Sequence, residues 1–250
     1  MILVPQSKID DYVGQGWWGE QTLADLFIDT AERQPDCFAV ADPPNRRQLT
    51  GADAKRWTWG DLLAQVGRCA ALFHAQGLRK DDIVVLQLPN CVEMHALYLA
   101  CAVSGIIVSP VPMQYRAHEL THVLASTGAR LAITTARVGN YRAAAQWAAH
   151  DSQFESLAQI WAYGDGDATD ALPAGVLALE PALCNTAAWS AAEMRAHMRA
   201  IDLSAHDVFT ICWTSGTEAR PKGVPRNHNE WLIVGRTWSR PAVCSLARSS

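Results

Sequence analysis

Short apolar runs alternate along this chain with longer segments that have helical periodicity. Five of the runs are rich in β-branched or aromatic residues and have the length of a buried strand: residues 83–88, 106–109, 131–134, 159–163 and 208–213. Strands that are separated by helices need crossover connections, which favour parallel pairing. We therefore expect an α/β fold in which a mostly parallel sheet is flanked by helices.

The helices have recognisable first turns. Thr22 is followed three residues later by Asp25, and Thr58 by Asp61, which is the pattern of an N-cap with an acidic partner. The first of these helices should end at Pro35 and the second at Gly77. Further helices are expected over residues 92–104, 116–127, 141–150 and 227–237. Residues 41–55 and 164–172 are rich in turn-forming residues; we expect the first to be a hairpin tip or a loose loop, and the second a surface turn.

The strand predicted at residues 208–213 leads into a loop of hydroxyl groups, glycines and one lysine. In order, its residues of interest are Thr214, Ser215, Gly216, Thr217, Pro221, Lys222 and Gly223. Glycines let backbone N–H groups approach a ligand closely, hydroxyl groups add donors, and lysine adds a positive charge, so such a loop can surround a polyphosphate. The spacing does not fit a Walker P-loop, which argues against a P-loop NTPase or a kinase. The alternative is a turn of small residues that binds nothing.

Residues 214–224, T-S-G-T-E-A-R-P-K-G-V, closely resemble the phosphate-binding signature of the adenylate-forming enzymes, the superfamily of acyl-CoA synthetases, aryl-acid ligases and peptide-synthetase adenylation domains. Ala219 departs from the pattern, since the family usually has Gly or Ser there. The resemblance continues upstream in the helix at 58–73, the strand and turn at 77–90 and the stretch at 95–110, and covers about residues 20–237. The residues after the loop, P-R-N-H-N-E-W-L, are most similar to ligases for medium-chain, alicyclic or aryl acids.

The resemblance implies an ATP-dependent carboxylic acid:CoA ligase that forms an acyl-adenylate and then a thioester. It implies ATP, Mg²⁺ and CoA as cofactors, with a carrier protein as an alternative acceptor. The ATP phosphates would be bound by Thr214, Ser215, Gly216, Thr217, Glu218 and Lys222, with the carboxylate of Glu218 structural or turned toward a metal. No catalytic residue and no metal ligand is assigned.

Family members are about twice as long as this chain, and their later motifs are absent here. We expect residues 1–237 to form the N-terminal half of an adenylation domain. Residues 238–250, rich in Ser and Arg, are interpreted as an aberrant or disordered tail that follows a frameshift near Thr237. A natural polar tail is the alternative. An inactive truncated product is the competing functional hypothesis, and it predicts an unpaired, aggregation-prone sheet.

Composition excludes several other classes of protein. The net charge of -4 comes without a basic stripe, so no nucleic-acid partner is expected. The seven cysteines form no C-x-x-C pair and are expected to be reduced thiols of a cytoplasmic protein. No secretory signal or membrane span is expected.

The tryptophans are interpreted as packing residues, and Asp81 with Asp82 as a solvated turn. Four histidines are interpreted as ordinary helix or surface residues: His95, His118, His122 and His228.

Overall fold

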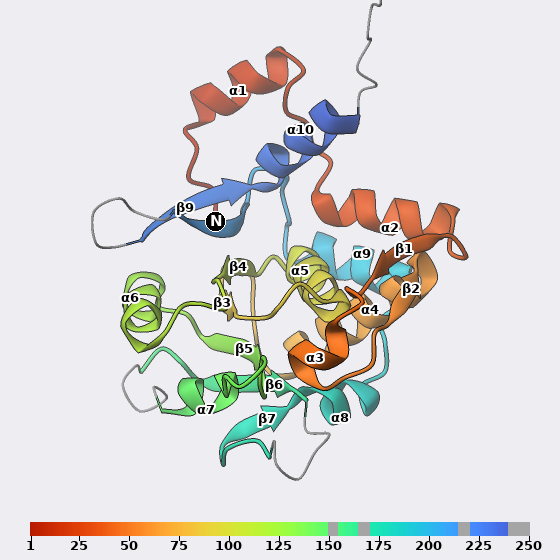
Figure 1. The fold of residues 1–250 in the computed structure, drawn as a ribbon. Helices are drawn as coiled ribbons and strands as arrows, with labels where there is room; N and C mark the ends of the chain where they lie inside the picture. The colour runs from red at the N-terminus through yellow and green to blue at the C-terminus, as the bar shows by residue number, and fades with distance from the viewer. Residues whose placement is uncertain (150–154, 165–170, 215–220, 240–250) are drawn as a thin grey trace, which may run out of the picture.

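The computed structural model describes residues 1–149, 155–164, 171–214 and 221–239. Within these residues the main sheet has seven strands in the order β7-β6-β5-β3-β4-β8-β9 (Figure 1). Their bounds are β3 Ile83–Leu86, β4 Ile107–Pro110, β5 Leu131–Thr135, β6 Gln159–Tyr163, β7 Val176–Ala178, β8 Val208–Thr214 and β9 Lys222–Asn227. The strands from β7 to β8 in this order pair in parallel, and β9 alone is antiparallel to its neighbour. The predicted α/β fold with a mostly parallel sheet is confirmed.

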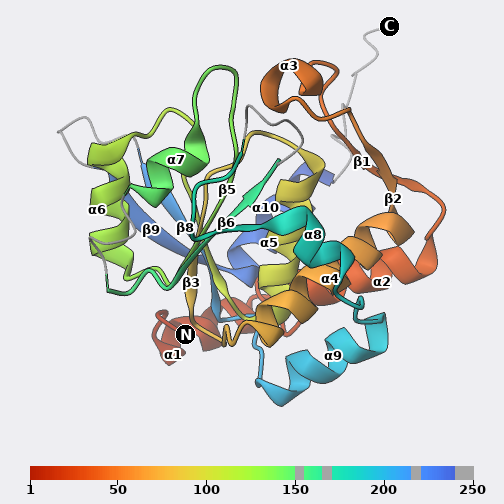
Figure 2. The same ribbon diagram turned by 90° about the horizontal axis from the view of Figure 1, so that it is seen from below.

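Helices cover both faces of the sheet. Figures 1 and 2 show α4 and α5 together on one side of the strands, and α6 and α7 on the other side. The first side also carries α2, α8 and α9, whereas α1 and α10 lie at one end of the molecule. The bounds are α1 Gln6–Gly14, α2 Leu23–Arg33, α4 Trp59–Ala75, α5 Val92–Ser104, α6 Ala117–Thr127, α7 Ala143–Ala148, α8 Leu179–Cys184, α9 Ala191–Ala200 and α10 His228–Ser239.

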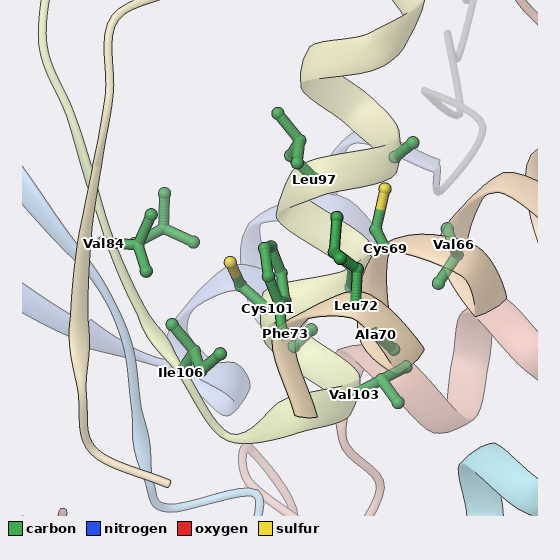
Figure 3. Close-up of a cluster of buried hydrophobic side chains, with 14 of the residues drawn as sticks. Val66, Cys69, Ala70, Leu72, Phe73, Val84, Leu97, Cys101, Val103 and Ile106 are labelled. Carbon is green, nitrogen blue, oxygen red and sulfur yellow. The ribbon is translucent and has the colours of Figure 1, made fainter. Parts of the chain in front are cut away.

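The strands divide their side chains between two cores. In β3, Val84 and Leu86 pack with α4 and α5, whereas Val85 points to the opposite side and packs with α6. This alternation follows from the period of two in a strand. Figure 3 shows the larger core, where Phe73 of α4 and Leu97 of α5 lie near Val84. Because both faces are covered, the strands read as continuous apolar runs, and this made them visible in the sequence.

The predicted helix starts are confirmed in detail. The side chain of Thr22 accepts a hydrogen bond from the N–H of Asp25, whose carboxylate in turn accepts from the N–H of Thr22. Thr58 and Asp61 form the same reciprocal pair at the start of α4. Each reciprocal pair, known as a capping box, satisfies N–H groups that the first turn of a helix leaves without a partner.

The segment at residues 41–55 is a hairpin tip rather than a loose loop. Strands β1, Phe38–Ala41, and β2, Arg56–Thr58, pair antiparallel, and a short helix, α3, Arg46–Thr50, lies between them. Sequence reasoning missed this helix, and it also missed α1, β7, α8, α9 and β9. Residues 165–170 of the predicted surface turn, and residues 240–250 of the predicted tail, lie outside the described residues.

Other predictions about residue roles can be compared with the described residues. Trp18 is buried and Trp57 and Trp59 pack against the larger core, as expected of packing residues, although Trp17 is about half exposed. The cysteines among the described residues are free thiols.

Asp81 lies in a turn with a φ of 71°. No cluster of three or more metal-ligating side chains occurs in the described part of the chain. None of the described helices is long and apolar enough to cross a membrane.

Candidate phosphate-binding hairpin and cleft

The predicted phosphate loop connects the two strands of a β-hairpin. In the β8–β9 ladder Thr214 lies opposite Lys222, and Trp213 lies opposite Gly223. A side chain at position 223 would have no room, because an added Cβ would lie 2.8 Å from Cγ2 of Ile211. Sequence reasoning missed β9 because Pro225 and the polar residues around it are atypical of a strand. A proline is tolerated in an edge strand such as this one.

Two of the six predicted site residues can be placed. Thr214 and Lys222 are both exposed, at the ends of the two strands, with the hydroxyl oxygen of Thr214 3.5 Å from the carbonyl oxygen of Lys222. No ion pair joins Lys222 to another of the described residues. Ser215, Gly216, Thr217 and Glu218 lie outside the described residues, as does Ala219.

Beside the hairpin, a cleft of about 540 Å³ opens at the carboxyl ends of β3 and β4. Its walls are residues 88–90, which lead to α5, residues 110–114, which lead to α6, and Cys212 with Trp213 of β8. Since α5 and α6 cover opposite faces of the sheet, the two connecting loops diverge here. A divergence of this kind at the carboxyl ends of parallel strands is the usual place for a ligand in an open α/β sheet.

The buried side chain of Gln87 fixes the wall of the cleft that leads to α6. Its amide nitrogen donates to the carbonyl oxygens of Pro112, at 3.1 Å, and Tyr115, at 3.2 Å. Its amide oxygen accepts a hydrogen bond from Nε1 of Trp147 at 2.8 Å. Sequence reasoning missed this residue; a glutamine inside an otherwise apolar strand run is the signal that could have identified it.

A cluster of charged side chains, buried except for Lys55, supports the wall that leads to α5. Arg46 of α3 donates to Asp42 and to Glu93, and Lys55 donates to the other oxygen of Glu93 at 2.7 Å. Asp42 also accepts from the N–H of Val92, in the first turn of α5. Burial alone would raise the pKa of Glu93, but the hydrogen bonds from Arg46 and Lys55 outweigh it and lower the pKa to about 2. Glu93 therefore remains ionised at neutral pH.

His228 has a structural position rather than a surface one. It is 1% exposed and stacks on Phe209, and its Nδ1 accepts a hydrogen bond from the N–H of Leu23 at 3.3 Å. Burial lowers its pKa to about 4, against the opposing effect of the carboxylates of Asp207 and Asp25. A neutral imidazole therefore links the start of α10 to the start of α2.

The arrangement of the strands, the hairpin and the cleft can be compared with known proteins. The family model described as "AMP-binding enzyme" matches residues 27–246, which is most of the chain. The chain belongs to the AMP-binding enzyme family. The match extends past Thr237, and the predicted boundary there stays a prediction.

Relatives of this AMP-binding protein include both CoA ligases and carrier-loading enzymes. A medium-chain fatty-acid–CoA ligase of Escherichia coli is 28% identical over 91% of this chain and 36% of its own length. A salicyl-AMP ligase / salicyl-S-ArCP synthetase of Mycobacterium tuberculosis is 34% identical over 50% of this chain and 21% of its own length. The chain thus spans well under half the length of these relatives.

Solved structures of AMP-binding proteins share the fold. The apo structure of MbtA from Mycobacterium smegmatis has a TM-score of 0.72 at 21% identity, and covers 92% of this chain and 38% of its own. The anthranilate CoA ligase AuaEII, in complex with anthranoyl-AMP, has a TM-score of 0.70 at 15% identity, over 88% of this chain and 37% of its own. At these identities the likeness establishes the fold alone.

Proposed function

We propose that this chain is the phosphate-binding part of an enzyme that activates a carboxylic acid with ATP. The observation that carries the proposal is the β8–β9 hairpin, which holds Thr214 opposite the exposed Lys222 next to the cleft. Residues 1–237 would be the N-terminal half of the adenylation domain.

In the proposed reaction the acid's carboxylate attacks the α-phosphorus of ATP, and pyrophosphate leaves to give an acyl-adenylate. Thr214, Ser215, Gly216, Thr217 and Lys222 would bind the β- and γ-phosphates, with Glu218 in the same loop. Holding these phosphates orients the leaving group and neutralises its charge, and both effects lower the barrier. The described residues include no cluster that fits Mg²⁺, so we assign the metal no step. In the second step a thiol displaces AMP and the thioester forms.

We propose a medium-chain, alicyclic or aryl acid as the substrate and CoA as the thiol. Support comes from the names of relatives, which include a medium-chain fatty-acid–CoA ligase and a crotonobetaine/carnitine–CoA ligase. A carrier protein is the alternative acceptor, because a salicyl-S-ArCP synthetase and a pseudomonine synthase are also among the relatives. A chain with no turnover of its own is the competing proposal for these 250 residues.

Acid-dependent exchange of labelled pyrophosphate into ATP tests the proposal. Octanoate, cyclohexanecarboxylate and benzoate serve as probes of the three acid classes, and the Lys222→Ala variant is the control. Exchange that requires one of these acids and that the variant loses would support the proposal. ATP binding without exchange would favour the competing proposal. If the chain neither binds ATP nor catalyses exchange, both proposals fail, because both assume that the hairpin binds the phosphates of ATP.

A further inference from the structure

The hairpin extends away from the parallel sheet. Of the residues in β8, only Thr210 pairs with β4, opposite Val108, whereas the ladder with β9 runs from Val208 to Thr214. Backbone pairing with the sheet therefore ends well before Thr214 and Lys222. Something other than the sheet has to fix the position of the far end of the hairpin.

Two side-chain hydrogen bonds hold this far end. Nε1 of Trp213 donates to the hydroxyl oxygen of Ser109, a buried residue of β4, at 2.9 Å. Nε2 of His122, on α6, lies 2.9 Å from the carbonyl oxygen of Pro221, the residue directly before Lys222. The rings of His122 and Trp213 also meet edge to face, with centroids 5.9 Å apart.

The chemistry of the second bond assigns the proton. A carbonyl oxygen can only accept, so Nε2 of His122 must carry the hydrogen. This tautomer donates whether the imidazole is neutral or protonated. The bond joins α6 to the first residues of β9, and α6 itself follows the loop that forms one wall of the cleft.

We propose that His122 is a positioning residue that holds Lys222 at the mouth of the cleft. The role rests on the proposed function, because it matters for activity only if Lys222 binds phosphate. It would also connect the two parts of the site mechanically: Gln87 fixes the loop before α6, and His122 on α6 fixes the hairpin. Figure 2 shows α6 beside the end of the sheet that β8 and β9 form.

Amide hydrogen exchange tests the tether without any ligand. In His122→Leu the loss of one hydrogen bond should raise exchange at the amides of residues 222–224 by about threefold to tenfold, while exchange in β3 and β5 stays unchanged. His122→Gln, whose amide N–H can replace Nε2–H, should restore most of the protection. His118→Leu removes an exposed imidazole from the first turn of the same helix and should have no effect on the hairpin. Equal exchange at residues 222–224 in His122→Leu and the wild type would overturn the tether.

Equilibrium binding of ATP then tests the consequence for phosphate. We expect His122→Leu to bind ATP about threefold to tenfold more weakly, with recovery in His122→Gln and an unchanged affinity for AMP. Equal ATP affinity in the wild type and His122→Leu would overturn the positioning role, even if exchange at the hairpin rises. A wild-type protein that binds no ATP would instead overturn the proposed function, and the exchange experiment would still decide whether the tether exists.

Discussion

The guanidinium of Arg46 donates a hydrogen bond of 2.8 Å to the buried carboxylate of Glu93, and this pair joins α3 to the first turn of α5. Both side chains are at most 5% exposed. Charges removed from water in this way are costly unless they are paired. The hairpin tip at residues 41–55 is therefore part of the support of the cleft.

Removing the arginine should destabilise the protein strongly. Arg46→Met leaves Glu93 with one cationic partner, Lys55, and we expect the free energy of unfolding to fall by about 3 kcal/mol. The next residue is a matched control, because Arg47 pairs with Asp53 where both side chains are about three-quarters exposed. Arg47→Met should change stability by less than about 0.5 kcal/mol. Urea unfolding measures the stability of both variants. Equal losses in Arg46→Met and Arg47→Met would show that the buried pair of Arg46 and Glu93 contributes no more to stability than the exposed pair of Arg47 and Asp53.

Acid should weaken the packing of α10 through His228. Burial lowers the pKa of this histidine from its ordinary value of 6.5 to about 4 in the folded protein, so the unfolded chain binds more protons between these values. Stability from this group is complete above pH 6.5 and is lost as the pH falls toward 4, by about 3 kcal/mol in total. His228→Asn, which keeps an acceptor for the N–H of Leu23, should remove this part of the pH dependence. Parallel unfolding curves against pH for the two proteins would contradict the assignment.

Replacing Gly67 of α4 should destabilise the protein. At Gly67 an added Cβ would lie 2.2 Å from the backbone oxygen of Trp189, so the segment before α9 would have to move. We expect Gly67→Ala to lower stability by about 1–3 kcal/mol, as overpacking does. Gly14→Ala is the control: it is also helical, but a Cβ there meets nothing within 4 Å, and the change should be neutral or stabilising. Thermal unfolding distinguishes the two, and a neutral Gly67→Ala would mean that the contact is loose.

The sequence predicted those elements whose local signals agree with the fold. The capping residues Thr22 and Thr58 and the buried strands β3 to β6 are examples, because local propensity and tertiary position coincide there. The strand β9 was missed because it is stabilised by pairing with β8, whereas its own residues, Pro225 among them, are atypical of a strand. The role of Glu93 was missed for a related reason: its partners Arg46 and Lys55 are distant in the sequence, and pairing over that distance leaves no local pattern. His122 illustrates the same limit, since its partner Pro221 lies 99 residues away.

The most direct test of the account is the binding of ATP and AMP to the wild type and to Lys222→Ala, with Lys8→Ala as a control at an exposed lysine of α1. If the hairpin binds the β- and γ-phosphates, the wild type should prefer ATP to AMP. Lys222→Ala should lose about tenfold to a hundredfold in ATP affinity, as expected for a charge-assisted bond, and little in AMP affinity. Equal binding of ATP by the wild type and Lys222→Ala, or no preference for ATP over AMP, would contradict the account.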